Sequence, residues 1–181
     1  LNTAKILEDL DFLNFKISVK ASDVILMVKA YEMLATKCDY PLHLGVTEAG
    51  PFNSGIVKSA MGLGTLLMQG IGDTLRISLS IPPKEEIPVC WNVLKGLGLR
   101  SRGVNIVACP SCARQAFDVI KVVSEVEAGT ANISKPLRIS MLGCVVNGLG
   151  EALESDRGVT GAGSRNHLIY INAKPELIVQ A

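Results

Sequence analysis

The sequence predicts an α/β protein in which parallel strands alternate with helices. Apolar runs of strand length alternate with amphipathic runs of helix length, and each pair occupies roughly 30 residues, the length of a βαβ unit. Hydrophobic side chains make up 48% of the 181 residues, whereas aromatic ones make up only 4%. A core of Val, Ile, Leu and Ala suits strands that are buried on both faces.

Strand–helix units are expected throughout the first hundred residues, after a short helical segment at residues 2–12. The expected strands lie at residues 15–19, 42–46 and 74–79, and the expected helices at residues 23–37, 54–69 and 84–97. Ser22 is the expected N-cap of the first of these helices, and right-handed crossovers make the strands parallel. A doubly wound sheet fits this pattern, and so does part of an eight-stranded β/α barrel, which needs about 250 residues when complete.

The second half contains a further strand–helix–strand unit. Its strands are expected at residues 104–108 and 137–142, and its helix at residues 114–127. The second strand leads directly into a glycine-rich stretch that begins at Gly143 and is expected to be a loop. Residues 154–166 are expected to be irregular, and a last strand at residues 167–172 precedes a short tail.

The composition excludes several classes of function. The net charge is +1, from 18 basic and 17 acidic side chains, so the chain lacks the basic surface typical of nucleic-acid binding. No apolar run reaches the roughly 20 residues needed to span a bilayer, and no basic-then-apolar leader opens the chain. We therefore expect a cytoplasmic protein without nucleic-acid or membrane partners. Because it opens at Leu1, inside a helical pattern, we also expect a piece of a longer protein.

Three of the five cysteines lie in two stretches that each follow a predicted strand. Cys109 and Cys112 form the motif CPSC, and Cys144 opens GCVVNGLGE. If the two strands are parallel, both stretches leave the same edge of the sheet. Glu151 follows closely enough to fold back as a fourth ligand. Three thiolates and one carboxylate suit an iron–sulfur cluster in which one iron stays open to chemistry.

The residues alone leave other interpretations open. A C-x-x-C pair also occurs in zinc ribbons and thiol oxidoreductases, and Glu151 could be an ordinary charge at a helix start. A zinc site usually has a second cysteine pair, and a redox dithiol would not explain Cys144. Gly143, Gly148 and Gly150 are expected to make room for a bulky group. The two other cysteines, expected to be small apolar side chains, are Cys38 and Cys90.

Five stretches identify a family resemblance that covers residues 15–161. They are FKISVKASD, PLHLGVTEAG, GLGTLLMQGIGDTLRISL, RSRGVNIVACPSCARQ and LGCVVNGLGEA. With them the chain resembles the C-terminal half of the 4-hydroxy-3-methylbut-2-en-1-yl diphosphate synthase family, iron–sulfur oxidoreductases of the methylerythritol phosphate route to isoprenoids.

The resemblance implies a fold and a cofactor. Residues 1–98 would be the C-terminal part of a β/α (TIM-type) barrel, and residues 99–181 a small α/β domain that holds a [4Fe–4S] cluster. The implied cluster ligands are Cys109, Cys112, Cys144 and Glu151.

The resemblance also implies a reaction. It is the reductive ring opening and dehydration of 2-C-methyl-D-erythritol 2,4-cyclodiphosphate to 4-hydroxy-3-methylbut-2-enyl diphosphate, with electrons from flavodoxin or ferredoxin. The full-length enzyme would be a homodimer. The first half of the barrel is missing here, so we expect a fragment without appreciable turnover. The alternatives are a non-catalytic iron–sulfur or zinc module and one subunit of a split enzyme.

Four further residues match positions that carry chemistry in the family. Lys20 would bind a phosphate, Glu48 would be the acid near the reacting centre, Ser78 would donate to a phosphate, and Asn147 would contact substrate beside the cluster. Each also has an ordinary structural interpretation, as a solvated strand end, a helix-start charge, a small core residue or a turn former. Two further residues are weaker candidates: His43 and Arg76.

Overall fold

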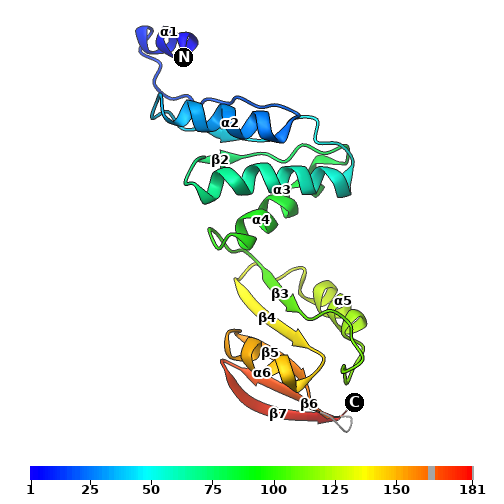
Figure 1. The fold of residues 1–181 in the computed structure, drawn as a ribbon. Helices are drawn as coiled ribbons and strands as arrows, with labels where there is room; N and C mark the ends of the chain where they lie inside the picture. Colours follow the sequence, from blue (N-terminus) through cyan, green and yellow to red (C-terminus); the bar gives the residue numbers. More distant parts are fainter. Residues whose placement is uncertain (163–165, 181) are drawn as a thin grey trace. The chain divides into compact units, whose positions relative to one another are not determined.

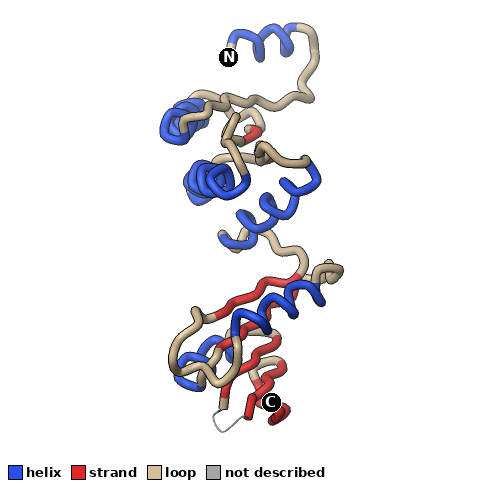
Figure 2. Tube along the Cα trace, turned by 90° about the vertical axis from the view of Figure 1, so that its right-hand side faces the viewer, coloured by secondary structure: helices blue, strands red, loops and turns tan. Residues whose placement is uncertain are grey.

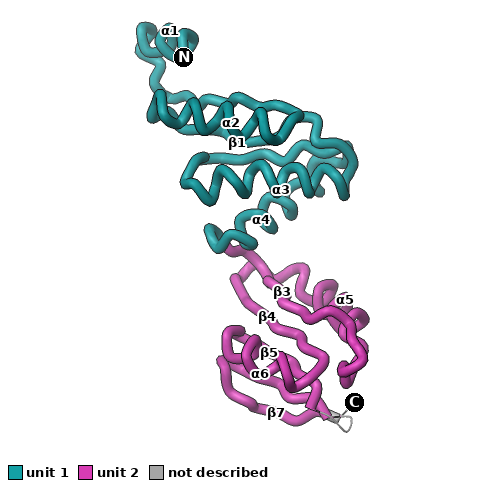
Figure 3. The backbone as a smooth tube through the Cα atoms, in the orientation of Figure 1, with its two compact units in different colours: residues 1–100 teal, residues 101–181 magenta. Residues whose placement is uncertain are grey.

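The computed structural model describes residues 1–162 and 166–180. The chain divides into two compact units, unit 1 at Leu1–Arg100 and unit 2 at Ser101–Ala181 (Figure 3). Both contain helices and strands, so the predicted mixed α/β class is confirmed. Among the described residues, no helix combines the length and the apolar character that crossing a bilayer requires.

Unit 1 contains four α-helices and very short strands (Figure 1). Its elements are α1 (Asn2–Asp9), α2 (Val24–Ala35), β1 (His43–Leu44), α3 (Phe52–Met68), β2 (Thr74–Leu75), the 3₁₀ turn η1 (Pro83–Glu85) and α4 (Glu86–Gly96). The helices lie close to their predicted positions. The N-cap of α2 is Asp23 rather than Ser22, because the Asp23 carboxylate accepts a hydrogen bond from the Leu26 amide at 2.7 Å.

The strands of unit 1 are shorter than predicted. β1 and β2 are parallel and pair over two residues each, and the predicted strand at residues 15–19 contributes one isolated parallel bridge, between Ile17 and Leu42. In that segment the amide of Val19 donates to the hydroxyl of Tyr31 at 3.1 Å and not to a neighbouring strand. The regular ladder is therefore interrupted by a side chain.

Side-chain packing holds unit 1 together. Helices α2 and α3 pack against each other (Figures 1 and 2). Gly62 of α3 permits their close approach, because a Cβ atom there would lie 2.5 Å from Cε of Met27. The fully buried side chains at the centre of this core come from both helices and from the segments around β1 and β2: Met27, Tyr31, Leu44, Val46, Leu63, Leu66 and Ile77.

Unit 2 is built on one five-stranded sheet (Figure 2). Its elements are β3 (Val104–Ala108), α5 (Val119–Thr130), β4 (Leu137–Leu142), α6 (Val145–Leu153), β5 (Arg157–Gly161), β6 (Asn166–Ile171) and β7 (Lys174–Gln180). The strands are ordered β3-β4-β5-β6-β7. β3, β4 and β5 are parallel, whereas β6 and β7 join as antiparallel neighbours.

Several predictions for unit 2 were wrong. The glycine-rich stretch after Gly143 is the helix α6 and not a loop. Helix α5 begins at Val119, later than predicted, because the Asp118 carboxylate caps it by accepting from the Lys121 amide at 3.1 Å. The stretch predicted as irregular contains β5, although residues 163–165 of it lie outside the described residues. The tail forms β7.

Candidate functional site

The two cysteine-bearing stretches meet at the carboxyl ends of β3 and β4. The amide of Gly143 donates to Sγ of Cys109 at 3.2 Å, and the Cys109 amide donates to the Met141 carbonyl at 3.2 Å. The Ala116 amide, from the loop after CPSC, donates to the Gly143 carbonyl at 2.7 Å. Parallel pairing of β3 with β4 therefore brings Cys109 to the residue that precedes Cys144, as the sequence predicted.

Cys144 is the N-cap residue of α6. The backbone amides of Asn147 and Val146 face its sulfur and lower the pKa of the thiol, and Arg114 lowers it further. A helix N-terminus favours a thiolate because its free amide groups carry partial positive charge. The surroundings of Cys144 therefore favour the thiolate form of its side chain.

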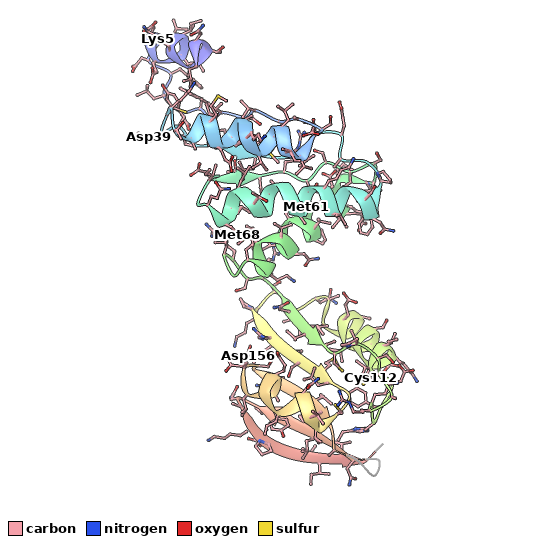
Figure 4. The ribbon with its side chains drawn as sticks, in the orientation of Figure 1. Lys5, Asp39, Met61, Met68, Cys112 and Asp156 are labelled. Atoms are coloured by element: carbon pink, nitrogen blue, oxygen red, sulfur yellow. The ribbon has the colours of Figure 1, made fainter. Side chains whose placement is uncertain are left out.

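A pocket of about 540 Å³ lies beside these stretches and contains three of the predicted site residues. Cys109, Asn147 and Glu151 all line it, together with Gly150. Cys112 lies in the loop between β3 and α5 and is exposed (Figure 4). The pocket thus joins a thiol, an amide and a carboxylate.

We expected Glu151 to fold back toward Cys144, but it lies further along the same helical segment. Both belong to the α6 segment, in which seven residues separate them, so the helix rise places them about 10 Å apart along the axis. The Glu151 carboxylate instead forms an ion pair with Arg138 of β4 at 3.4 Å. Both side chains are a little under half exposed, and the Arg138 guanidinium balances the charge of the carboxylate.

The predicted cluster ligands are three thiols and one carboxylate, from Cys109, Cys112, Cys144 and Glu151. Within residues 1–162 and 166–180, no three His, Cys, Asp or Glu side chains lie close enough together to share one metal ion. The ligands of a cubane cluster bind different irons and are spaced more widely than the ligands of one ion. Three cysteines and a carboxylate match such a cluster in chemistry. The ligand assignment stays a prediction.

The glycines around the pocket have packing roles that the sequence did not reveal. A Cβ atom on Gly143 would lie 2.8 Å from Cβ of Gln115, and one on Gly148 would lie 2.5 Å from Cγ2 of Thr160. These two glycines make room for the protein itself and not for a ligand. A Cβ atom on Gly150 would meet nothing within 4 Å, so this glycine does face open space.

Unit 1 gathers cationic side chains around its strand ends. The side chain of Lys20 passes close to Gly45, where a Cβ atom would lie 3.0 Å from Lys20 Cε. Burial lowers the pKa of Lys20, and the charges of Arg76 and Lys16 lower it further. Burial likewise lowers the pKa of His43, followed by the charges of Lys20, Lys16 and Arg76. We call Lys16, Lys20, His43 and Arg76 the cationic group.

The sequence reasoning missed Lys16 as a member of the cationic group. The sequence does contain a pattern that indicates it. Every second residue of an extended segment points to the same side, so Lys16 and Lys20, four residues apart, lie on one side of the segment. The polar side chains beside the group are ordered by hydrogen bonds. His43 Nδ1 lies 2.8 Å from Thr74 Oγ1, and Arg76 Nε donates to Ser78 Oγ at 2.9 Å.

Glu48 lies in the loop after β1 and is exposed. Its φ of 51° is in the left-handed region, which non-glycine residues adopt infrequently. The Thr47 amide donates to the Ala21 carbonyl at 3.1 Å, which ties this loop to the segment that follows Lys20. An acid in an uncommon backbone conformation, close in sequence to the strand end, fits a functional position.

Together the fold and the sites define an α/β protein with a thiol-containing pocket in one unit and a cationic group at the strand ends of the other. The chain belongs to the GcpE family. Residues 1–91 match the GcpE TIM-barrel domain, and residues 105–180 match the GcpE protein C-terminal domain.

Relatives with known names are similar to the whole chain. Three examples, all named 4-hydroxy-3-methylbut-2-en-1-yl diphosphate synthase (flavodoxin), are each 58% identical. Those of Granulibacter bethesdensis and Gluconacetobacter diazotrophicus match all 181 residues, which cover 47% of each relative. The protein of Caulobacter vibrioides matches 97% of the chain, which covers 46% of that relative. The chain therefore spans about half the length of the curated relatives it matches.

Proposed function

We propose that this chain is the C-terminal half of a 4-hydroxy-3-methylbut-2-en-1-yl diphosphate synthase. The supporting observation is the contact between Gly143 and Cys109, which joins the two cysteine-bearing stretches at one sheet edge. The name that the relatives share supports this synthase activity and flavodoxin as the electron donor. Ferredoxin is the alternative donor that the family resemblance implies. The whole enzyme would reduce and dehydrate 2-C-methyl-D-erythritol 2,4-cyclodiphosphate in the cytoplasm and would be a homodimer.

In this proposal unit 2 holds a [4Fe–4S] cluster through Cys109, Cys112, Cys144 and Glu151. When bound, the cluster supplies single electrons and an iron that accepts a substrate oxygen. The raised acidity of the Cys144 thiol favours ligation at neutral pH. Glu151 would be the weak oxygen ligand, and Arg138, which pairs with it at 3.4 Å, would balance the charge of its carboxylate. Asn147 lines the same pocket and would orient substrate there.

The proposed role of unit 1 is to hold the charged end of the substrate. Lys20 would bind a phosphate as a point charge, and Arg76 and Ser78, which already contact each other, would donate to phosphate oxygens. Burial and the charges of Lys20, Lys16 and Arg76 lower the pKa of His43, which lies beside these cations. Glu48 would hold the proton that the leaving hydroxyl needs to depart as water.

Anaerobic reconstitution of the 181-residue chain with iron and sulfide tests the cofactor. We expect a brown protein with four irons per chain and an electron paramagnetic resonance signal after reduction. Cys144→Ser is expected to abolish the signal, whereas the control Cys38→Ser should keep it, because Cys38 only donates to the Leu34 carbonyl within unit 1. Colourless protein with stoichiometric zinc would support a structural metal module instead.

Activity tests the reaction separately. The chain alone is expected to show no turnover. Co-expression with the N-terminal half of a relative, followed by assay with reduced flavodoxin and the cyclic diphosphate, is expected to restore it. The proposal fails if the assembled protein carries the cluster but does not convert this substrate.

A further inference from the structure

Tyr31 of α2 is fully buried, and its hydroxyl lies between two backbone segments of unit 1. The hydroxyl accepts a hydrogen bond from the Val19 amide at 3.1 Å and donates to the His43 carbonyl at 2.5 Å. Ser18 Oγ lies 3.3 Å from the same hydroxyl and donates to the same carbonyl at 3.0 Å. One side-chain oxygen thus connects the strand-like segment around Val19 to β1.

This hydroxyl occupies one position of a parallel ladder. The Ile17 amide donates to the Pro41 carbonyl and the His43 amide donates to the Ile17 carbonyl, each at 2.8 Å. In a regular parallel ladder the next hydrogen bond would run from the Val19 amide to the His43 carbonyl. Both groups bind the Tyr31 hydroxyl instead, and that replaces a direct hydrogen bond with a two-step bridge.

The bridge adjoins the cationic group on both sides. His43 supplies the bridged carbonyl, and Lys20 follows Val19 directly in the chain. The side chain of Lys20 in turn packs over Gly45, two residues after His43. The separation of the two segments at the bridge therefore sets where Lys20 lies relative to His43.

We propose that Tyr31 is a positioning residue whose hydroxyl, inserted between Val19 and His43, fixes the spacing of Lys20 and His43. The role in phosphate binding rests on the proposed function, whereas the spacing itself does not. Burial of the aromatic ring holds the hydroxyl in place, so the bridge is more rigid than a water molecule in the same position would be.

Tyr31→Phe tests this role because it keeps the ring and removes only the bridging oxygen. The remaining ring keeps the segments from closing to form the direct hydrogen bond, so the Val19 amide must recruit water and the His43 carbonyl keeps only the hydrogen bond from Ser18 Oγ. Lys20 then moves away from His43, and His43 becomes better hydrated. We expect the pKa of His43 to rise toward 6.5, its ordinary value.

Histidine proton resonances followed by NMR during a pH titration report this change. The chain has two histidines, and His167 of unit 2 serves as the internal reference. The matched control is Tyr40→Phe, which removes a phenol hydroxyl that donates to Glu8 at 2.5 Å on the exposed side of the same unit. A folded Tyr31→Phe protein whose His43 titrates as in the unchanged chain would overturn the proposal.

A second measurement needs no substitution and decides the matter if Tyr31→Phe does not fold. The Val19 amide of the unchanged chain should exchange with solvent deuterium much more slowly than an open loop amide, because the buried Tyr31 oxygen accepts its hydrogen bond. Exchange at the rate of an unprotected amide would show that the bridge is not formed and would overturn the proposal.

Binding of inorganic pyrophosphate, measured by calorimetry, connects the bridge to the proposed function. We expect Tyr31→Phe to weaken binding by about two- to tenfold, the effect of one hydrogen bond, and Tyr40→Phe to leave it unchanged. If the unchanged chain binds no pyrophosphate, the assigned role of Lys20 fails, and the titration of His43 still decides the role of Tyr31.

Discussion

The two units are ordered by different means. Unit 1 has a large set of fully buried apolar side chains but strands of only two residues. Unit 2 has a continuous five-stranded sheet, and several of its closest contacts are made by glycines that touch backbone or short side chains. The cationic group therefore depends on side-chain packing, whereas the thiol pocket depends on the close approach of backbone segments.

Gly161 illustrates the second mode. A Cβ atom at this position in β5 would lie 2.3 Å from the Gly143 carbonyl oxygen and 2.7 Å from Cβ of Ala116. The three residues belong to β5, to the start of the α6 segment and to the loop after CPSC. Their contact fixes the place where the cysteine-bearing stretches meet.

The largest expected effect breaks the core of unit 1. Leu63→Ala empties a fully buried site in α3, and we expect a loss of about 2–5 kcal/mol in the free energy of unfolding of unit 1. Fluorescence of Trp91, the single tryptophan, measures this in urea because it lies in α4. The control Met61→Ala, at a side chain 61% exposed, should cost less than about 0.5 kcal/mol. Equal losses would contradict the packing account.

Gly161→Ala breaks the contact in unit 2. The added methyl group must displace backbone, so we expect the free energy of unfolding of unit 2 to fall by about 1–3 kcal/mol. The amide resonances of unit 2, followed in urea, measure this loss. Gly150→Ala is the matched control, because its methyl group meets nothing within 4 Å. Replacing this helical glycine should raise the free energy of unfolding of unit 2 by about 0.5–1 kcal/mol. A neutral Gly161→Ala would remove the basis of the comparison.

The stability of unit 1 is expected to depend on pH through His43. Burial and the charge of Lys20 lower the pKa of His43 in the folded chain. As the pH falls below 6.5, His43 is therefore protonated in the unfolded chain before it is protonated in the folded chain. The stabilisation is complete above pH 6.5 and is lost as the pH falls toward the folded pKa. Urea titrations at pH 7.5 and 5.5 should show this loss for the unchanged chain but a smaller one for His43→Asn. A loss of the same size in both would rule out His43 as its source.

The smallest expected effect concerns the ion pair of Arg138 and Glu151. Because both side chains are partly exposed and screened by solvent, Arg138→Gln should cost less than about 1 kcal/mol in the stability of unit 2. Lys121→Gln, which breaks the 3.9 Å pair with Glu125, is the control. Hydrogen exchange at low and high salt measures both. A loss that is large and independent of salt would show that Arg138 has a packing role.

The sequence predicted β3 and β4 at their observed bounds because both are short runs rich in branched apolar side chains with glycine and proline residues close on either side. It missed β5 because Gly158 and Gly161 weaken any strand pattern. Tertiary packing explains why β5 contains glycine, since a Cβ atom on Gly158 would lie 2.9 Å from Ser140 Oγ of the neighbouring strand. Gly148 helped to conceal α6 for the same reason, because a Cβ atom there would lie 2.5 Å from Cγ2 of Thr160.

Local patterns also did not show the bridge made by Tyr31, because it joins a helix to two segments that lie apart in the chain. The position of Tyr31 in the sequence fits an apolar helix face and does not indicate what its hydroxyl binds. Of the candidate sites, the meeting of Cys109 with the Gly143 region followed from strand order alone. The positions of Cys112 and Glu151 did not, because they depend on where α5 and α6 begin.

Helix α6 carries the proposed sulfur donor Cys144 at its start and the oxygen donor Glu151 near its end. A rigid rod cannot withdraw one of these donors by tilting or sliding without disturbing the other. In the proposed centre, a change in the position of Glu151 would therefore come from the torsions of its own side chain, while the helix that carries Cys144 would stay in place.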